Sequence, residues 1–176
     1  ARAGAPRNVK GAVLAGGDAG FYEQEGLNDW GIARGMAVTM RAGHTRQGGS
    51  TITQQVVKNL LLDSERTYKR KIREALLSRR IEQELSKDEI LEMYLNDVSL
   101  GQRGSFGVIG VSEASRLFFG KDISNITLAE AATIAGVYQS PSALSPFNNP
   151  VKCKERRNVV LPAMVDAGCV PQAAAD

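Results

Sequence analysis

The stretch from Gln47 to Asn59 reads QGGSTITQQVVKN. Two glycines make a turn, and Thr51 is followed three residues later by a glutamine, which is the capping-box pattern of a helix start. The predicted helix runs to about Leu62. At about 100° per residue, one sector of it is polar but almost uncharged, with Val56, Val57, Leu60 and Leu61 opposite. The polar side chains are Thr51, Gln54, Gln55, Lys58 and Asn59.

Polar side chains of this kind are typical of hydrogen-bonding groups that line a cleft for a polar or anionic ligand. The ordinary alternative is an amphipathic surface helix, although a solvated face normally carries more Glu and Lys. The preceding glycines allow close approach of a ligand, and the start of a helix favours negative charge. The sequence therefore predicts a ligand site at this helix.

Helix starts and stops recur along the chain, whereas strict apolar–polar alternation is hard to find, which predicts a mainly α fold. Seven helices are expected, and an apolar segment at residues 8–15 precedes them. Residues 102–107 are expected to form a glycine-rich loop and residues 141–150 a long proline-containing loop. The expected helices cover residues 30–41, 51–62, 64–85, 86–96, 108–119, 127–140 and 151–167.

Composition indicates one folded domain and excludes several classes of chemistry. The chain has 176 residues, 43% of them hydrophobic, and a net charge of +3, which identifies no partner class. His44 is the only histidine, so serine-protease-like triads and multi-histidine metal sites are excluded. Acid–base chemistry must therefore use carboxylates. Cys153 and Cys169 are too few for a disulfide framework, and no apolar run approaches the roughly 18 residues of a membrane span.

A second candidate site is the basic stretch around Glu74 on the helix expected at residues 64–85. Arg70 and Glu74 are four residues apart and could form an ordinary exposed pair. The functional alternative is a carboxylate among cations in a phosphate-binding cleft. Tyr68, Ile72 and Leu76 repeat at helical spacing on the same helix. The cations are Arg66, Lys69, Arg70, Lys71 and Arg73.

The 47–59 stretch resembles the signature of family 51 glycosyltransferases, the peptidoglycan polymerases of penicillin-binding proteins and their monofunctional relatives. Four further blocks follow in the family order across essentially the whole chain. They are RKIREA from Arg70, SKDEILEMYLN from Ser86 with Leu100-Gly101, LAEAA from Leu128, and Pro141 with Pro146.

The resemblance implies a lysozyme-like, two-lobed helical domain with a substrate cleft over residues 1–176. It also implies an anchor before Ala1 and, in bifunctional members, a transpeptidase domain after Asp176. The family substrate is lipid II, whose polyprenyl pyrophosphate is expelled, with inversion, when the 4-hydroxyl of an acceptor sugar attacks. Expected partners are lipid II, the growing glycan chain, the membrane surface and other cell-wall synthesis proteins, and no nucleic acid.

The family pattern assigns roles to individual residues of this chain. Ser50, Gln54, Lys58 and Arg66 match positions that contact the sugar-phosphate donor, and the basic side chains of Arg70 and Arg73 are expected to bind substrate as well. Glu74 matches the second family glutamate, which assists the leaving pyrophosphate. Gln55 and Asn59 match structural supports of their helix. Mg²⁺ or Mn²⁺ is expected on the pyrophosphate, with no organic cofactor and no metal ligands assigned.

The first family block departs from the pattern. It reads Glu-Asp, two residues, Phe, two residues, His, one residue, Gly, and here it is GDAGFYEQEG from Gly17. The catalytic base position is therefore Gly17, which has no proton acceptor, and the histidine is Gln24. General-base catalysis typically contributes about 10²–10⁴ in rate, so polymerisation should be impaired. Asp18 is the first candidate substitute base, ahead of Glu23 and Glu25.

Two further hypotheses follow from this departure and from the fold class. The chain could be a catalytically silent module that binds lipid II, such as a scaffold, a sensor or an inactivated variant. A lysozyme-type hydrolase needs a carboxylic acid that protonates the leaving oxygen, and Glu74 lies among cations instead. Synthesis at the extracytoplasmic (periplasmic) face of the bacterial cytoplasmic membrane is the favoured hypothesis. Apolar side chains of the small lobe, within about residues 60–120, are then expected to dip into the lipid.

Overall fold

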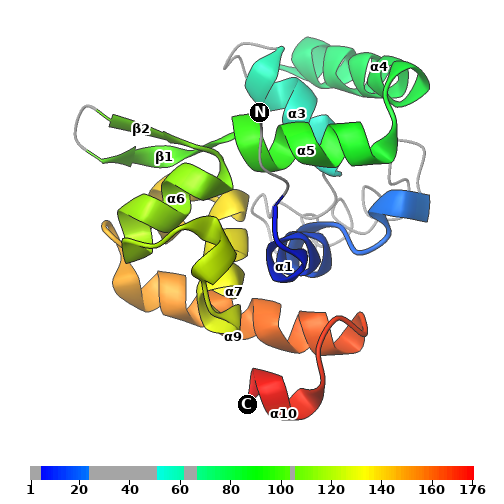
Figure 1. Ribbon diagram of the computed structural model, residues 1–176. Helices are drawn as coiled ribbons and strands as arrows, with labels where there is room; N and C mark the ends of the chain where they lie inside the picture. Colours follow the sequence, from blue (N-terminus) through cyan, green and yellow to red (C-terminus); the bar gives the residue numbers. More distant parts are fainter. Residues whose placement is uncertain (1–4, 24–50, 62–66, 104–105) are drawn as a thin grey trace, which may run out of the picture. The chain divides into compact units, whose positions relative to one another are not determined.

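The computed structural model describes residues 5–23, 51–61, 67–103 and 106–176, and these residues are mainly helical (Figure 1). The mainly α fold class is therefore confirmed. The chain divides into two compact units, one made of Ala1–Ala19 with Leu95–Asp176 and the other of Gly20–Tyr94. The range of residues 60–120 expected for a small lobe is wrong, since it takes parts of both units.

The core of the first unit is built on three helices that contact one another, α1 (Arg7–Gly17), α7 (Leu128–Gln139) and α9 (Pro150–Asp166). Residues 131–138 of α7 are all buried, so this helix is apolar around its circumference, as expected of a central helix. The segment at residues 8–15, where no helix was expected, is the inner part of α1. Its buried residues are Val9, Ala12 and Val13.

Shorter elements complete this unit. They are α6 (Gly110–Phe119), a 3-10 turn η2 (Ile123–Asn125), α8 (Pro141–Leu144) and α10 (Gln172–Ala175). The expectation of a loop at residues 141–150 is wrong in its first part, because Pro141 starts α8, where a missing N–H costs no helical hydrogen bond.

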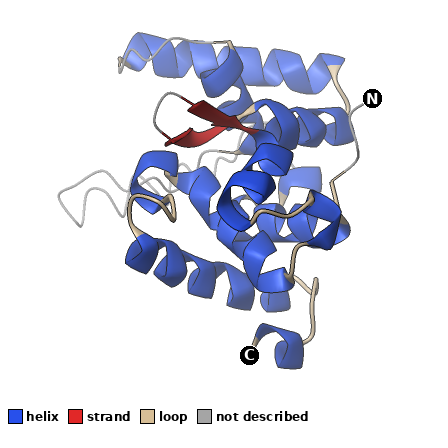
Figure 2. Ribbon diagram, turned by 60° about the vertical axis from the view of Figure 1, so that its left-hand side comes forward, coloured by secondary structure: helices blue, strands red, loops and turns tan. Residues whose placement is uncertain are grey.

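A β-hairpin replaces the glycine-rich loop expected at residues 102–107 (Figure 2). Strand β1 (Ser99–Arg103) pairs antiparallel with β2 (Phe106–Ile109), with Gln102 opposite Gly107. The strands are too short to show alternation, and cross-strand hydrogen bonds form them. The hairpin returns through Gly110, which has φ +80° and begins α6 against the backbone of Asn96.

The second unit contains the 3-10 turn η1 (Phe21–Glu23), α3 (Ile52–Leu60), α4 (Tyr68–Glu84) and most of α5 (Lys87–Asp97). Helix α3 packs against α4. Ile90, Leu91 and Tyr94 form the buried side of α5 and are 0–3% exposed. The helix expected at residues 30–41 lies outside the described residues.

The capping box expected at Thr51–Gln54 is confirmed, and two further boxes are formed by Ser86–Glu89 and Thr127–Glu130. The start of α4 differs, because the hydroxyl of Thr67, not Ser64, accepts a hydrogen bond from the Arg70 backbone N–H. In the part of the chain that the structure describes, no helix is long and apolar enough to cross a membrane.

Candidate functional site

The N-terminus of α3 is built by two buried polar side chains. The hydroxyl of Thr51 accepts a 3.1 Å hydrogen bond from the Gln54 backbone N–H, and Oε1 of Gln54 accepts a 2.9 Å bond from the Thr51 backbone N–H. Gln54 is 3% exposed. Its carbonyl oxygen therefore serves the helix cap, a structural function beside the substrate contact predicted for it.

Gln55 and Asn59 make contacts that fit the supporting role predicted for them. Oε1 of Gln55 accepts a 2.8 Å hydrogen bond from the Tyr94 hydroxyl of α5. Nδ2 of Asn59 donates a 2.7 Å hydrogen bond to the carbonyl oxygen of Gln55, one turn earlier. The first bond ties α3 to α5, and the second lies within α3.

Lys58 is the exposed cation of α3 and makes no hydrogen bond or ion pair with the residues that the structure describes. Val56 and Val57 are fully buried on the opposite face, so the amphipathic orientation predicted for this helix is confirmed there. Leu60 and Leu61, expected on that apolar face, are 38% and 53% exposed at the C-terminal end of the helix. Ser50 and Arg66 lie outside the described residues.

Glu74 is the centre of the second candidate site. Its carboxylate is 1% exposed and lies on α4 among cations of the same helix. Nζ of Lys71 lies 2.9 Å from Oε1, and Nη1 of Arg70 lies 3.4 Å from Oε2. Lys71 is 55% exposed, whereas Arg70 is 12% exposed. The expectation of an exposed pair is therefore wrong. Glu74 is a buried carboxylate that pairs with two cations, Arg70 and Lys71.

The buried side of α4 is polar, which the sequence pattern did not predict. Glu74 and Ser78 are its buried residues, and Oγ of Ser78 donates a 2.7 Å hydrogen bond to the Glu74 carbonyl oxygen. The apolar repeat faces solvent instead: Tyr68, Ile72 and Leu76 are 93%, 61% and 63% exposed. This repeat, which we call the α4 stripe, lies nearly opposite the buried pair on the helix.

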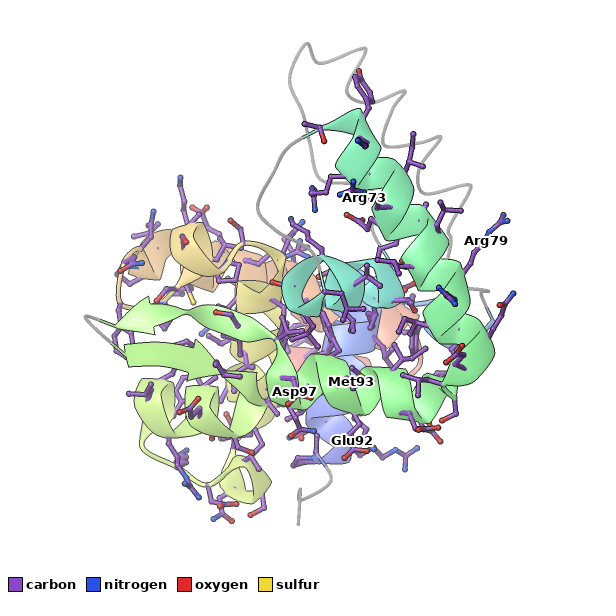
Figure 3. The ribbon with its side chains drawn as sticks, turned by 90° about the horizontal axis from the view of Figure 1, so that it is seen from above. Arg73, Arg79, Glu92, Met93 and Asp97 are labelled. Atoms are coloured by element: carbon purple, nitrogen blue, oxygen red, sulfur yellow. The ribbon has the colours of Figure 1, made fainter. Side chains whose placement is uncertain are left out.

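Cations border the α4 stripe. Arg73 and Arg79 leave α4 on different sides, as Figure 3 shows, and both are exposed. Lys69 and Arg80 are exposed as well. The outer surface of α4 is therefore apolar along one line and positively charged beside it.

Sequence reasoning missed a polar cluster around Glu82 that joins four elements of the second unit. Its Oε1 accepts hydrogen bonds from the Thr53 hydroxyl at 2.5 Å and from Nζ of Lys87 at 2.7 Å. The same Nζ lies 4.5 Å from the ring centroid of Phe21, a geometry suited to a cation–π contact. A threonine on the apolar side of α3 was the available signal.

The first family block is anchored to this cluster through η1. Phe21 is 1% exposed, and the neighbouring Tyr22 hydroxyl donates a 2.7 Å hydrogen bond to Oδ1 of Asp88. Partial burial, and then the hydrogen bond and the charge of Asp88, raise the pKa of Tyr22 to about 12.

The expected base position, Gly17, is the last residue of α1 and is exposed. No atom of the described residues lies within 4 Å of a Cβ built on it, apart from its own neighbours, so these residues leave space for a β-carbon there. Asp18 follows as the C-cap residue, and its backbone N–H donates a 2.8 Å hydrogen bond to the Leu14 carbonyl oxygen. Asp18 is only 7% exposed, and its role as a substitute base stays a prediction. Gln24 and Glu25 lie outside the described residues.

Among the described residues, no three His, Cys, Asp or Glu side chains come together as a metal site. The carboxylate of Glu74 is already engaged by two cations. These residues do not build a protein-held site for Mg²⁺ or Mn²⁺.

Comparison with known proteins assigns these features to a family. The model of the family described as transglycosylase matches residues 2–165. The chain belongs to the transglycosylase family. The recognition of a family 51 glycosyltransferase domain is thereby confirmed, and so is the enzyme class, peptidoglycan glycosyltransferase.

Several curated relatives of this transglycosylase chain carry the same name. Penicillin-binding protein 1A of Neisseria flavescens is 45% identical over 94% of the chain, and that of Escherichia coli K12 is 46% identical over 95%. The matched region is 20% and 19% of those two proteins. The chain therefore spans about a fifth of the length of these relatives.

Proposed function

We propose that this transglycosylase chain takes lipid II as its substrate and extends glycan strands by inverting transfer, with a rate limited by Gly17. The observation that carries the proposal is the family match together with a cationic surface organised around a buried carboxylate at Glu74. Charge-assisted hydrogen bonds from Lys and Arg are the strong contacts available to a pyrophosphate.

The leaving pyrophosphate gains negative charge as the glycosidic bond breaks, and cations held in place stabilise that charge. Lys58 is an exposed cation of α3, and α3 packs against α4. Arg70 and Lys71 are oriented by Glu74. We assign Glu74 to the leaving group through these two cations, because its own buried carboxylate would repel a phosphate.

The acceptor hydroxyl needs a base, and Gly17 provides none. Among the described residues, no atom beyond its immediate neighbours lies within 4 Å of a Cβ built on Gly17, so the end of α1 has space for a β-carbon at this position. Asp18 is buried and is a weaker candidate for this role. Slow polymerisation is the expected property of the chain.

The test is lipid II polymerisation with gel readout of glycan length, on this chain, on Gly17→Glu and on Gly17→Gln. The glutamate variant should polymerise about 10²-fold faster or more, and the glutamine variant, which has the size but not the basicity, should not. Equal rates for Glu and Gln would contradict the assignment of the base position. Fast polymerisation by the unchanged chain would show that another carboxylate serves, and Asp18→Asn would be the next variant.

A second candidate function is binding of lipid II without turnover, which the same glycine favours. Cation sites for the pyrophosphate do not depend on residue 17, so binding can survive loss of the base. The expected result is that lipid II binds this chain and Gly17→Glu with similar dissociation constants. Absence of polymer from both variants, with binding retained, would favour this candidate over the enzyme.

The lipid part of the substrate places the reaction at a membrane surface, and we assign the α4 stripe to that surface. Exposed Tyr68, Ile72 and Leu76 with neighbouring cations suit the boundary between acyl chains and anionic headgroups. The proposed location is the extracytoplasmic face of the bacterial cytoplasmic membrane. Other cell-wall synthesis proteins remain proposed partners, and any Mg²⁺ or Mn²⁺ would depend mainly on the pyrophosphate oxygens.

A further inference from the structure

Arg156 of α9 reaches across to the end of α1. Its Nη2 donates a 2.9 Å hydrogen bond to the carbonyl oxygen of Gly16, the residue before Gly17. The last carbonyls of a helix lack partners within the helix and attract positive charge, so a guanidinium is well suited to this position. Arg156 therefore ties α9 to the last turn of α1.

Two glycines make room for this contact. A Cβ on Gly136 of α7 would lie 2.9 Å from Cγ of Arg156, and a Cβ on Gly16 would lie 3.1 Å from Cγ2 of Val160. The first distance is too short for real atoms, and the second is tight. The side chain of Arg156 thus passes over α7 at Gly136. Its methylene groups fit there because Gly136 has no Cβ.

Burial of the Arg156 side chain has a cost in free energy. Arg156 is half-buried, and its Nε is buried without a hydrogen-bond partner in the part of the chain that the structure describes. Loss of solvation lowers the pKa of Arg156. A buried cation with an unsatisfied N–H stabilises a core less than an apolar side chain of similar size does. Its specific contribution is the hydrogen bond at the C-terminus of α1.

We propose that Arg156 is a positioning residue that fixes the last turn of α1, and through it residue 17, the position of the general base. This inference rests on the proposed function. A base must lie within hydrogen-bond reach of the acceptor hydroxyl, and a displacement of about 1 Å can cost about 10²-fold in rate. Arg156 bonds the backbone of α1, so in a chain that carries a glutamate at position 17 its loss should lower kcat and leave KM for lipid II nearly unchanged.

The activity experiment uses Gly17→Glu as the parent and adds Arg156→Met, Arg156→Lys or Gly136→Ala. We expect kcat to fall about tenfold or more in Arg156→Met and by a smaller factor in Gly136→Ala. In both variants KM should change less than about twofold. Arg156→Lys keeps a cationic donor and should recover part of the loss. Arg157→Met is the matched control, because the Arg157 guanidinium bonds only its neighbour Asn158 within the described residues.

Hydrogen exchange separates this proposal from the proposed function, because it needs no activity. The Asp18 backbone N–H is bonded to Leu14 in the last turn of α1. Its exchange and that of its neighbours at residues 15–18 should rise in Arg156→Met and stay unchanged in Arg157→Met. An inactive Gly17→Glu parent would overturn the proposed function alone, and local exchange would still decide whether Arg156 holds α1.

Two results would overturn the positioning role. One is a folded Arg156→Met variant with the kcat of its parent. The other is a rise in exchange spread equally over α1, α7 and α9, which would mean that Arg156 stabilises the unit as a whole.

Discussion

Nζ of Lys71 lies 2.9 Å from Oε1 of Glu74 within a single turn of α4, and the glutamate side chain is 1% exposed. The pair joins a buried anion to a cation that reaches solvent. An ion pair in which both partners are exposed contributes little to stability. When one partner is buried, removing a partner leaves the other charge without compensation and destabilises the fold. Glu74 therefore links the stability of α4 to the placement of its cations.

Glu74→Gln, made in the Gly17→Glu chain, should lower lipid II polymerisation about 10²-fold or more, because Lys71 and Arg70 lose the charge that orients them. It should also lower the free energy of unfolding by about 1–3 kcal/mol, since charged hydrogen bonds are lost. Glu84→Gln is the control, being exposed on the same helix. Unchanged polymerisation in Glu74→Gln would rule out its role at the leaving group.

Gln54 and Lys58 lie one turn apart on α3 and should separate stability from binding. Gln54→Ala removes a buried cap and should cost about 1 kcal/mol of unfolding free energy in urea. Lys58→Ala changes an exposed side chain, so unfolding should stay within about 0.5 kcal/mol while lipid II binding weakens at least about tenfold. Lipid II binding that survives Lys58→Ala intact would remove this lysine from the donor site.

Gly110 and Gly120 both have a positive φ angle and should differ in their tolerance of alanine. Gly110 has φ +80°, and a Cβ there would lie 2.5 Å from the Asn96 carbonyl oxygen. Gly120 has φ +65°, with no described atom within 4 Å of a Cβ beyond its own neighbours. Gly120→Ala should cost about 1 kcal/mol and Gly110→Ala at least about 2 kcal/mol more, measured by thermal unfolding. Equal losses of stability in the two variants would show that the backbone at Gly110, after the hairpin, can shift to accept a Cβ.

The α4 stripe should govern binding to lipid. Ile72→Asp and Leu76→Asp should each raise the dissociation constant for vesicles that contain anionic lipid about tenfold, in a co-sedimentation assay, with little effect on folding. Val159→Asp is the control, since Val159 is 56% exposed on α9 in the other unit. An equal loss of vesicle binding in all three variants would point to charge alone rather than to the stripe.

Glu130 should make stability depend on acid pH. Burial raises its pKa, but hydrogen bonds from Lys121 and Thr127 outweigh burial and hold the pKa below the ordinary value of 4.5. Because the pKa is lower in the folded state, the stabilisation is present above about pH 4.5 and is lost as the pH falls through the folded pKa.

Glu130→Gln keeps the capping acceptor and removes the titration, so its melting temperature should fall less steeply below about pH 4.5. Glu155→Gln, exposed on α9, should follow the unchanged chain. If the melting temperatures of Glu130→Gln and of the unchanged chain fall equally as the pH is lowered, other carboxylates cause the loss of stability at acid pH.

Local patterns carried the sequence predictions that succeeded. The boxes at Thr51, Ser86 and Thr127 are formed by residues three apart, and the left-handed cap at Gly120 depends on one residue. The hairpin at residues 99–109 was missed, because pairing across strands leaves no periodic signal in segments this short. Tyr68, Ile72 and Leu76 share one side of α4, as their spacing indicates, but this side faces solvent, since spacing identifies a face and not whether that face meets the core.

The amino-acid sequence by itself determined the family, the mainly α fold class and the absence of a carboxylate at residue 17, because each is a property of residue identity and local spacing. The tertiary structure decided which polar groups are buried and with whom. Glu82 receives hydrogen bonds from Thr53 and Lys87, and Arg156 reaches Gly16 across 140 residues of chain. Desolvation makes such groups pair, and only the packing of distant helices determines the partners that they find.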